Sequence, residues 1–246
     1  MRVTRPARPV LRDVIETAYR LDTDLGELRL MGVDLSRTEA APGDSFVVTL
    51  CWSADETPTI DVIARLSLHT AGGAEAAAFD VPPTSAAHPT TAWQAGDLWC
   101  GRHALHFPAD LESGGYTLRL TLLPIAQSAT NLPTTNLPIT NLPITIHITA
   151  PPRIFTLPAP QHPLSITLGQ QATLLGYDLS ESTLSAGQPL TITLYWRAEA
   201  TAATGYVIFV QLLDRANRIY AQSDRPPAAG TRRTTGWLSG EMIYGT

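Results

Sequence analysis

The segment TLCWSA at residues 49–54 recurs as TLYWRA at residues 193–198. The same offset of 144 residues places LMGVDLS, which begins at Leu30, on LLGYDLS, which begins at Leu174. It also places TTAWQAGD at 90–97 on TTGWLSGE at 234–241. The register does not slip between these matches, so the chain contains two copies of one domain.

Apolar residues occupy every second position within each copy. The row that ends at Trp52 begins at Phe46, and residues 190–196 repeat it with Trp196 at its end. A period of two is typical of a half-buried β-strand, and it turns both tryptophans toward the core. Gly- and Pro-containing turns separate the strands. The sequence therefore predicts an all-β chain of two tandem immunoglobulin-like antiparallel β-sandwiches.

The repeat also sets the expected boundaries. The position that matches the last residue, Thr246, is Arg102, and the first copy runs on past it for about three more strands. We therefore expect the second sandwich to lack its C-terminal strands. The expected order is an N-terminal extension 1–24, a first sandwich 25–150 with a low-complexity loop at 126–143, a Pro-rich linker 151–163 and a truncated second sandwich 164–246.

A sandwich without its last strands should leave apolar rows uncovered. Tyr206, Ile208 and Val210 are the residues that we expect to be partly exposed. A strand-donating partner could pair beside them, or residues 1–24 could do so. The remaining alternative is that the second copy is poorly folded.

Composition restricts the partners. The 246 residues carry a net charge of −5 and contain no Lys, which argues against nucleic acid. Residues 120–152 are uncharged but contain six Pro, which rules out a membrane helix there. No apolar core follows the N-terminal arginines, so no secretory signal is visible and the compartment stays open.

No motif of a known catalytic or cofactor site occurs, and we predict a non-enzyme without a cofactor or metal. His103 and His106 could suggest metal ligation, but that spacing in a strand sends them to opposite faces. Asp22 and Asp24 resemble the start of a calcium loop whose later ligands are absent, which favours a solvated acidic turn.

Two repeated carboxylates are candidates for a general base. Asp34 matches Asp178 and Asp80 matches Asp224, but no partner acid or His recurs beside them, so a turn or strand-end role is expected. A bridge between Cys51 and Cys100 requires their strands to be neighbours, and the sequence leaves this open.

Aromatic rings are the remaining candidates because sugars stack on exposed Trp or Tyr. Trp93 and Trp237, in the repeated T-T-x-W-x-x-G-[DE] segment, are the candidate binding residues. They either offer a platform or plug one end of the sandwich, and the plug is the favoured interpretation. Trp99 and Tyr220 cannot be placed.

The run from LLGYDLS through TLYWRAEA to TTGWLSGE (residues 174–241) resembles a repeated C-terminal module of bacterial polytopic membrane glycosyltransferases of the protein-O-mannosyltransferase-like class. In that family the catalytic acids belong to a transmembrane part that this chain lacks, so the resemblance carries over no catalytic residue. It implies an ancillary, extracytoplasmic β-sandwich.

Two functions remain open at this stage. The chain is either a non-catalytic module that binds glycan, envelope material or another protein chain, or a structural spacer or fragment of a larger glycosyltransferase without binding activity. An exposed aromatic shelf would favour the first. An enzyme, which requires acids and His from different strands in one cleft, ranks far behind.

Overall fold

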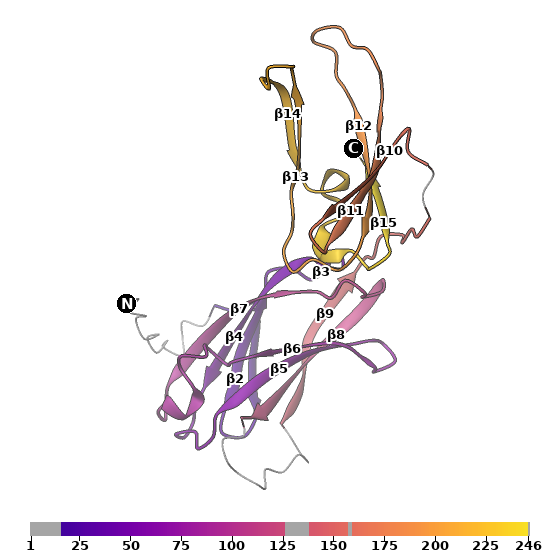
Figure 1. Ribbon diagram of the computed structural model, residues 1–246. Helices are drawn as coiled ribbons and strands as arrows, with labels where there is room; N and C mark the ends of the chain where they lie inside the picture. Colours follow the sequence, from indigo (N-terminus) through magenta and orange to yellow (C-terminus); the bar gives the residue numbers. More distant parts are fainter. Residues whose placement is uncertain (1–15, 126–137, 157–158, 246) are drawn as a thin grey trace. The chain divides into compact units, whose positions relative to one another are not determined.

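The computed structural model describes residues 16–125, 138–156 and 159–245 (Figure 1). The prediction of an all-β chain is confirmed, because the regular structure in these ranges is β-sheet with three short 3-10 turns. The turns are η2 (Thr90–Ala92), η3 (Ala228–Gly230) and η4 (Thr234–Gly236). No helix among the described residues is long and apolar enough to cross a membrane.

The chain separates into two compact units. Unit 1 contains the described parts of Met1–Ala40, Ser45–Phe107 and Ser113–Thr149, and unit 2 contains those of Ala41–Asp44, Pro108–Glu112 and Ala150–Thr246. Each unit is described below by itself.

Unit 1 consists of two sheets. The first has the order β1-β2-β4-β7 and the second the order β3-β9-β8-β5-β6, and neighbouring strands are antiparallel except for β3 and β9. The strands of the first sheet are β1 (Tyr19–Asp24), β2 (Arg29–Leu35), β4 (Ser45–Ser53) and β7 (Leu98–His106). Those of the second are β3 (Glu39–Ala40), β5 (Val62–His69), β6 (Glu75–Val81), β8 (Gly114–Pro124) and β9 (Ile139–Ile148).

Both sheets of unit 1 contribute to one core. Phe46 of β4 meets Phe79 of β6 edge to face, with ring centroids 5.5 Å apart, and stacks on Phe107 at 4.2 Å. Trp52 is fully buried, as its place in the alternating row predicts, and its indole N–H donates to the carbonyl oxygen of Pro83 at 3.2 Å. The alternation of apolar side chains therefore specifies the buried face of unit 1.

Strand β9 begins earlier than the sequence predicts. It starts at Ile139, inside the stretch 126–143 that was expected to be loop, and Thr140 and Asn141 pair with β8. The register of the β8–β9 pair shifts between Thr117 and Arg119, which face the segment that contains Pro143. Proline has no N–H to donate to a ladder, so the irregular register accommodates it instead of ending the strand.

Unit 2 repeats part of this arrangement. Its four-stranded sheet has the order β10-β11-β12-β15, and a separate hairpin joins β13 to β14. The bounds are β10 (His162–Leu168), β11 (Ala172–Leu179), β12 (Ile192–Ala198), β13 (Ile208–Leu213), β14 (Ile219–Arg225) and β15 (Met242–Gly245). The offset of 144 residues places the hairpin on β5–β6 of unit 1.

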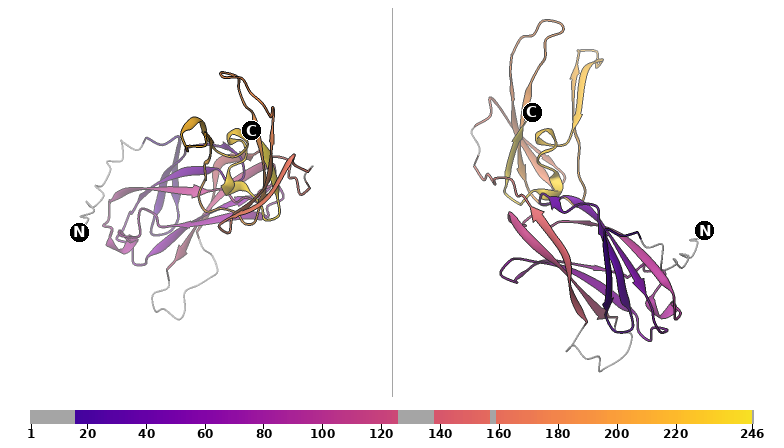
Figure 2. Two further views of the ribbon diagram at one scale, coloured as in Figure 1. Left: turned by 45° about the horizontal axis from the view of Figure 1, so that its top comes forward. Right: turned by 180° about the vertical axis from the view of Figure 1, so that it is seen from behind.

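The core of unit 2 is smaller. It contains Trp196, Trp237 and Ile243, and Ile208 is the residue of β13 that packs against it. Figure 1 and the right-hand view of Figure 2 show the hairpin β13–β14 projecting past the four-stranded sheet of the same unit. Most of this hairpin is consequently exposed.

Candidate binding face on the second unit

The two tryptophans predicted as candidate binding residues lie in buried positions. Trp93 follows η2 and Trp237 follows η4, and they are 1% and 2% exposed. The indole N–H of Trp237 donates to the carbonyl oxygen of Arg232 at 2.8 Å. The ring of Trp93 lies 6.4 Å from that of Trp99. Neither ring presents a face to solvent in this structure.

A threonine hydroxyl supports each of these turns. The Thr90 hydroxyl donates to the carbonyl oxygen of Ile60 at 2.8 Å and accepts the amide of Val62 at 3.2 Å. The Thr234 hydroxyl makes the same two bonds, to Thr204 at 3.2 Å and from Tyr206 at 3.0 Å. The repeated T-T-x-W segment therefore holds the backbone at the start of β5 in unit 1 and just before β13 in unit 2.

The repeated carboxylates at Asp34 and Asp178 bind backbone. Asp34 accepts the amide of Ala18 at 2.5 Å, and Asp178 accepts the amide of Gln161 at 2.6 Å and the hydroxyl of Tyr195 at 2.6 Å. Both hydrogen bonds lower the pKa of Asp178, and the one from the Tyr195 hydroxyl has the larger effect. Both carboxylates hold the edge strand of their sheet to its neighbour.

The other acidic residues that were considered as candidates form ion pairs with arginines. Arg29 contacts Asp22 at 3.0 Å and Asp24 at 3.8 Å, and Asp24 accepts the amide of Gly26. Asp80 forms a two-pronged pair with Arg65 at 2.7 and 2.8 Å, and this pairing lowers the pKa of Asp80. Among the described residues no group of three or more His, Cys, Asp or Glu side chains could hold a metal.

The two histidines of β7 differ in environment. His103 is half-buried and His106 is exposed, at alternate-facing positions of one strand. Burial lowers the pKa of His103, since the charged imidazolium loses solvation there.

Glu241 is a buried acid whose role the sequence analysis missed. Its side chain is fully buried and bridges two arginines, Arg153 at 2.7 Å and Arg232. It also accepts the amide of Leu238 at 3.0 Å, which closes the turn after Trp237. The corresponding turn in unit 1 is closed by Asp97, which accepts the amide of Gln94 at 2.8 Å. The repeated acid therefore has a structural place in both units.

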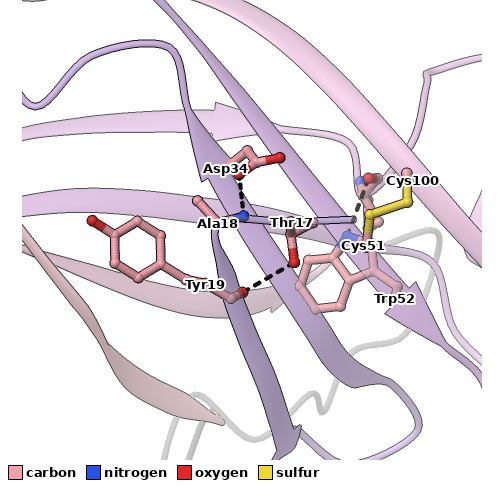
Figure 3. The surroundings of a disulfide bond; sticks show 8 residues. Thr17, Ala18, Tyr19, Asp34, Cys51, Trp52 and Cys100 are labelled. Atoms are coloured by element: carbon pink, nitrogen blue, oxygen red, sulfur yellow. Dashed lines mark hydrogen bonds between the residues drawn. A yellow bond between two sulfur atoms is a disulfide. The ribbon is translucent and has the colours of Figure 1, made fainter. Parts of the chain in front are cut away.

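The strand order shows that Cys51 and Cys100 lie on neighbouring strands. Strands β4 and β7 are adjacent, Cys51 lies directly opposite Cys100, and a disulfide joins them (Figure 3). Cys51 is buried against Leu98 and Met31 on the outer side of the first sheet. The bridge therefore fastens the two strands away from the main core.

The aromatic side chains of unit 2 with the highest exposed fractions lie on the hairpin β13–β14. Phe209 is 67% exposed and Tyr220 is 66% exposed. In β13 Phe209 alternates with Ile208, which faces the core. Phe209 lies opposite Asp224, and Gln211 lies opposite Gln222. Since side chains alternate along a strand, Gln222 shares the outer face with Gln211 and Phe209. Tyr220 lies next to them at the register shift of the hairpin, between Ala221 and Ile219.

An amide pair lies between the two rings. The side-chain nitrogen of Gln211 donates to the side-chain oxygen of Gln222 at 3.4 Å, and both residues are exposed. Tyr220 and Asp224 are four strand residues apart, which corresponds to ~13 Å. We call Phe209, Gln211 and Gln222, together with the exposed Tyr220 at the register shift, the outer hairpin face.

The hairpin turn is held by one carboxylate. Asp214 accepts the amides of Ala216 at 2.8 Å and Arg218 at 2.9 Å, and its other oxygen accepts the guanidinium of Arg218 at 2.7 Å. Asn217 adopts a positive φ of 59°, a conformation that Asn tolerates well. Hydrogen bonding to the Arg218 amide lowers the pKa of Asp214. The strands that carry the outer hairpin face are therefore joined by a defined turn.

No protein-family model and no curated protein matches the chain. Two solved structures show a distant similarity in fold. The crystal structure of the C-terminal domain of wzt has a TM-score of 0.39 and 13% identity, over 55% of this chain and 82% of that chain. Spo0M, the sporulation control protein from Bacillus subtilis, has a TM-score of 0.32 and 12% identity, over 77% of this chain and 76% of that chain. Neither assigns a family.

Proposed function

We propose that this chain is a non-catalytic binding module and that it takes carbohydrate on the outer hairpin face. The observation that supports the proposal is the exposure of Phe209 and Tyr220, 67% and 66%, on one hairpin. Sugar rings stack their C–H faces on aromatic rings, and exposed side-chain amides offer hydrogen bonds to hydroxyl groups.

The comparison with the other copy strengthens the proposal. The position of Phe209 is occupied in unit 1 by Arg65, which pairs with Asp80, and that of Tyr220 is occupied by Ala76. Two apolar rings therefore replace a charged and a small residue on an exposed surface. Exposed rings do not stabilise a hydrophobic core, so we attribute their exposure to the binding of a ligand.

The spacing indicates the class of ligand. Two rings separated by more than ~13 Å of strand cannot both contact one monosaccharide, so an oligosaccharide is the expected ligand. Each aromatic contact contributes ~0.5–1.5 kcal/mol, which predicts a weak interaction at a single module.

Two finer statements belong to the same proposal. The units are two related immunoglobulin-like sandwiches, of which the second has fewer strands over the residues that the structure describes, and the chain accompanies a membrane glycosyltransferase at the cell envelope. The alternative is a spacer or fragment of such an enzyme, which binds no glycan.

The test is a glycan-array screen of the full chain beside three variants. Phe209→Ala and Tyr220→Ala should each lower binding about two- to tenfold. Phe155→Ala is the matched control, because Phe155 is 54% exposed in the same unit but lies outside the hairpin. Unchanged circular dichroism is required of all three. Absence of binding by the parent chain would favour the spacer, and equal losses in all three variants would contradict the assigned face.

A further inference from the structure

The disulfide of unit 1 joins two strands that the backbone already pairs. Strands β4 and β7 stay in register from Ser45 opposite His106 to Ser53 opposite Leu98, and Cys51 lies opposite Cys100 within this ladder. In the part of the chain that the structure describes, β7 pairs with β4 alone, so it is an edge strand of the first sheet. The bridge is therefore an additional bond on an edge strand.

Unit 2 keeps the same strand pairing without a covalent bond. Tyr195 and Tyr244 occupy the positions that match the two cysteines, and they lie opposite each other in β12 and β15. The two strand pairs have the same register once the offset of 144 residues is applied. Non-covalent contacts therefore suffice for this pairing, and we expect β4 and β7 to remain folded when the bridge of unit 1 is reduced.

The two cysteines differ in their access to solvent. Cys51 is 2% exposed and packs with Leu98 and Met31, whereas Cys100 is an exposed residue. Thiol–disulfide exchange begins when a thiolate reaches one sulfur of the bridge, so its rate depends on access to that sulfur. The sulfur of Cys100 is therefore the one that a reductant attacks, and Cys51 is the leaving group.

Strand β7 also contacts a segment that holds a core residue. Gly101, next to Cys100, lies against the backbone of Pro83 and Thr84 and leaves no room for a Cβ atom. The carbonyl oxygen of Pro83 accepts the indole N–H of the buried Trp52 at 3.2 Å. Opening of β7 therefore removes packing from the segment that provides the hydrogen-bond acceptor of Trp52.

We propose that the bridge between Cys51 and Cys100 is a redox-sensitive bond, which a dithiol reductant cleaves in the folded chain and which controls the local opening of β7. One thiolate of the dithiol attacks the sulfur of Cys100, forms a mixed disulfide and releases Cys51, which takes up a proton. The second thiol of the reductant then displaces Cys100 as a thiol. Two electrons pass to the bridge, and the dithiol becomes a disulfide.

Cleavage changes the equilibrium between the closed and the open edge. The bridge closes a loop between cysteines 49 residues apart, which restricts the conformations of any state in which β7 has left β4. Without the bridge these open conformations gain chain entropy, so β7 opens more often while the rest of unit 1 stays folded. This device belongs to unit 1 and does not depend on the proposed carbohydrate face.

The experiment treats the full chain with dithiothreitol in the absence of denaturant. Thiol titration should show a reduction rate that rises in proportion to the dithiothreitol concentration, with unchanged circular dichroism. Amide exchange at residues 98–106 should become about tenfold faster or more after reduction. Residues 242–245 of β15 are the internal control, because the matching strand of unit 2 has no bridge, and their exchange should not change.

Two pairs of measurements test the direction of attack and the folded state. In the reduced chain, iodoacetamide should alkylate Cys100 about tenfold faster than Cys51 or more, since thiol reactivity follows exposure. Cys51→Ser and Cys100→Ser, each with one remaining thiol, are the matched variants for this comparison. The double variant Cys51→Ser and Cys100→Ser should retain the circular dichroism of the parent and show the fast exchange of the reduced chain at residues 98–106.

Four outcomes overturn the proposal. The first is a reduction rate that does not depend on dithiothreitol and equals the rate of global unfolding, because the bridge would then open only in the unfolded chain. The second is loss of folded structure in the reduced chain or in the double Ser variant. The third is unchanged exchange at residues 98–106 after reduction, and the fourth is equal alkylation of the two thiols.

Discussion

Tyr195 and Tyr244 stack across strands β12 and β15, with ring centroids 5.8 Å apart and ring planes inclined by 15°. They lie directly opposite each other, as Cys51 and Cys100 do across β4 and β7. The offset of 144 residues relates the two pairs. One position in the fold is thus closed by a covalent bond in unit 1 and by an aromatic contact in unit 2.

This equivalence predicts that a disulfide can replace the tyrosine pair. The double variant Tyr195→Cys and Tyr244→Cys should oxidise and gain about 2–4 kcal/mol over its own reduced form. Thiol titration and urea unfolding with and without reductant measure this. A double Ser variant controls for reduction of the native bridge, and free thiols at both new positions under oxidising conditions would contradict the shared register.

The buried position of Glu241 predicts a large cost for its neutralisation. Glu241→Gln leaves the partly buried charges of Arg153 and Arg232 without their counter-ion, which should destabilise unit 2 by about 3–5 kcal/mol. Glu181→Gln, at an exposed position of the same unit, should cost less than about 0.5 kcal/mol. Urea unfolding followed by circular dichroism and tryptophan fluorescence provides the measurement. Equal effects of the two variants would refute the bridging role.

The environment of His103 predicts a loss of stability in acid. Its pKa is lowered by burial from the ordinary 6.5, so the unfolded chain binds a proton that the folded chain does not. The contribution is complete above about pH 6.5 and falls as the pH drops below it toward the folded pKa. His103→Gln should flatten the free energy of unfolding between about pH 6.5 and 5. His106→Gln controls for the loss of an imidazole on the same strand, and parallel curves for parent and His103→Gln would disprove the effect.

The duplicated threonine bonds predict parallel effects in both units. Thr90→Val leaves the amide of Val62 without its side-chain acceptor, and Thr234→Val does the same to Tyr206. Each variant should lose about 1–3 kcal/mol. Thermal unfolding of both checks this, with Thr91→Val as the neighbouring comparison. A loss in only one unit would show that the turn has different roles in the two copies.

The strand pattern could be predicted because burial imposes a period of two on each strand. The row from Phe46 to Trp52 is buried as expected, and Trp196 occupies the same place in unit 2. The partners of single residues were harder to predict. The disulfide depends on β4 and β7 being neighbours, and no local pattern around Cys51 or Cys100 specifies strand order.

Part of the candidate face could be predicted from the sequence. Superposing the copies replaces Arg65 by Phe209 and Ala76 by Tyr220, a change that signals a different outer surface. What could not be derived was that both residues lie on one open hairpin, because this depends on register across a turn. Trp93 is a different case, because its conspicuous motif marks a hydrogen-bonded turn around a buried ring.

The turn at Asp214 affects the order in which the strands pair during folding. Hairpin β13–β14 joins residues that are close along the chain, so its loop closes with little loss of chain entropy. Strand β5, in contrast, must find β8 across some fifty intervening residues. Local pairings form within microseconds, whereas distant ones slow the folding rate. The hairpin β13–β14 is therefore expected to form early, before the slower pairings between distant strands.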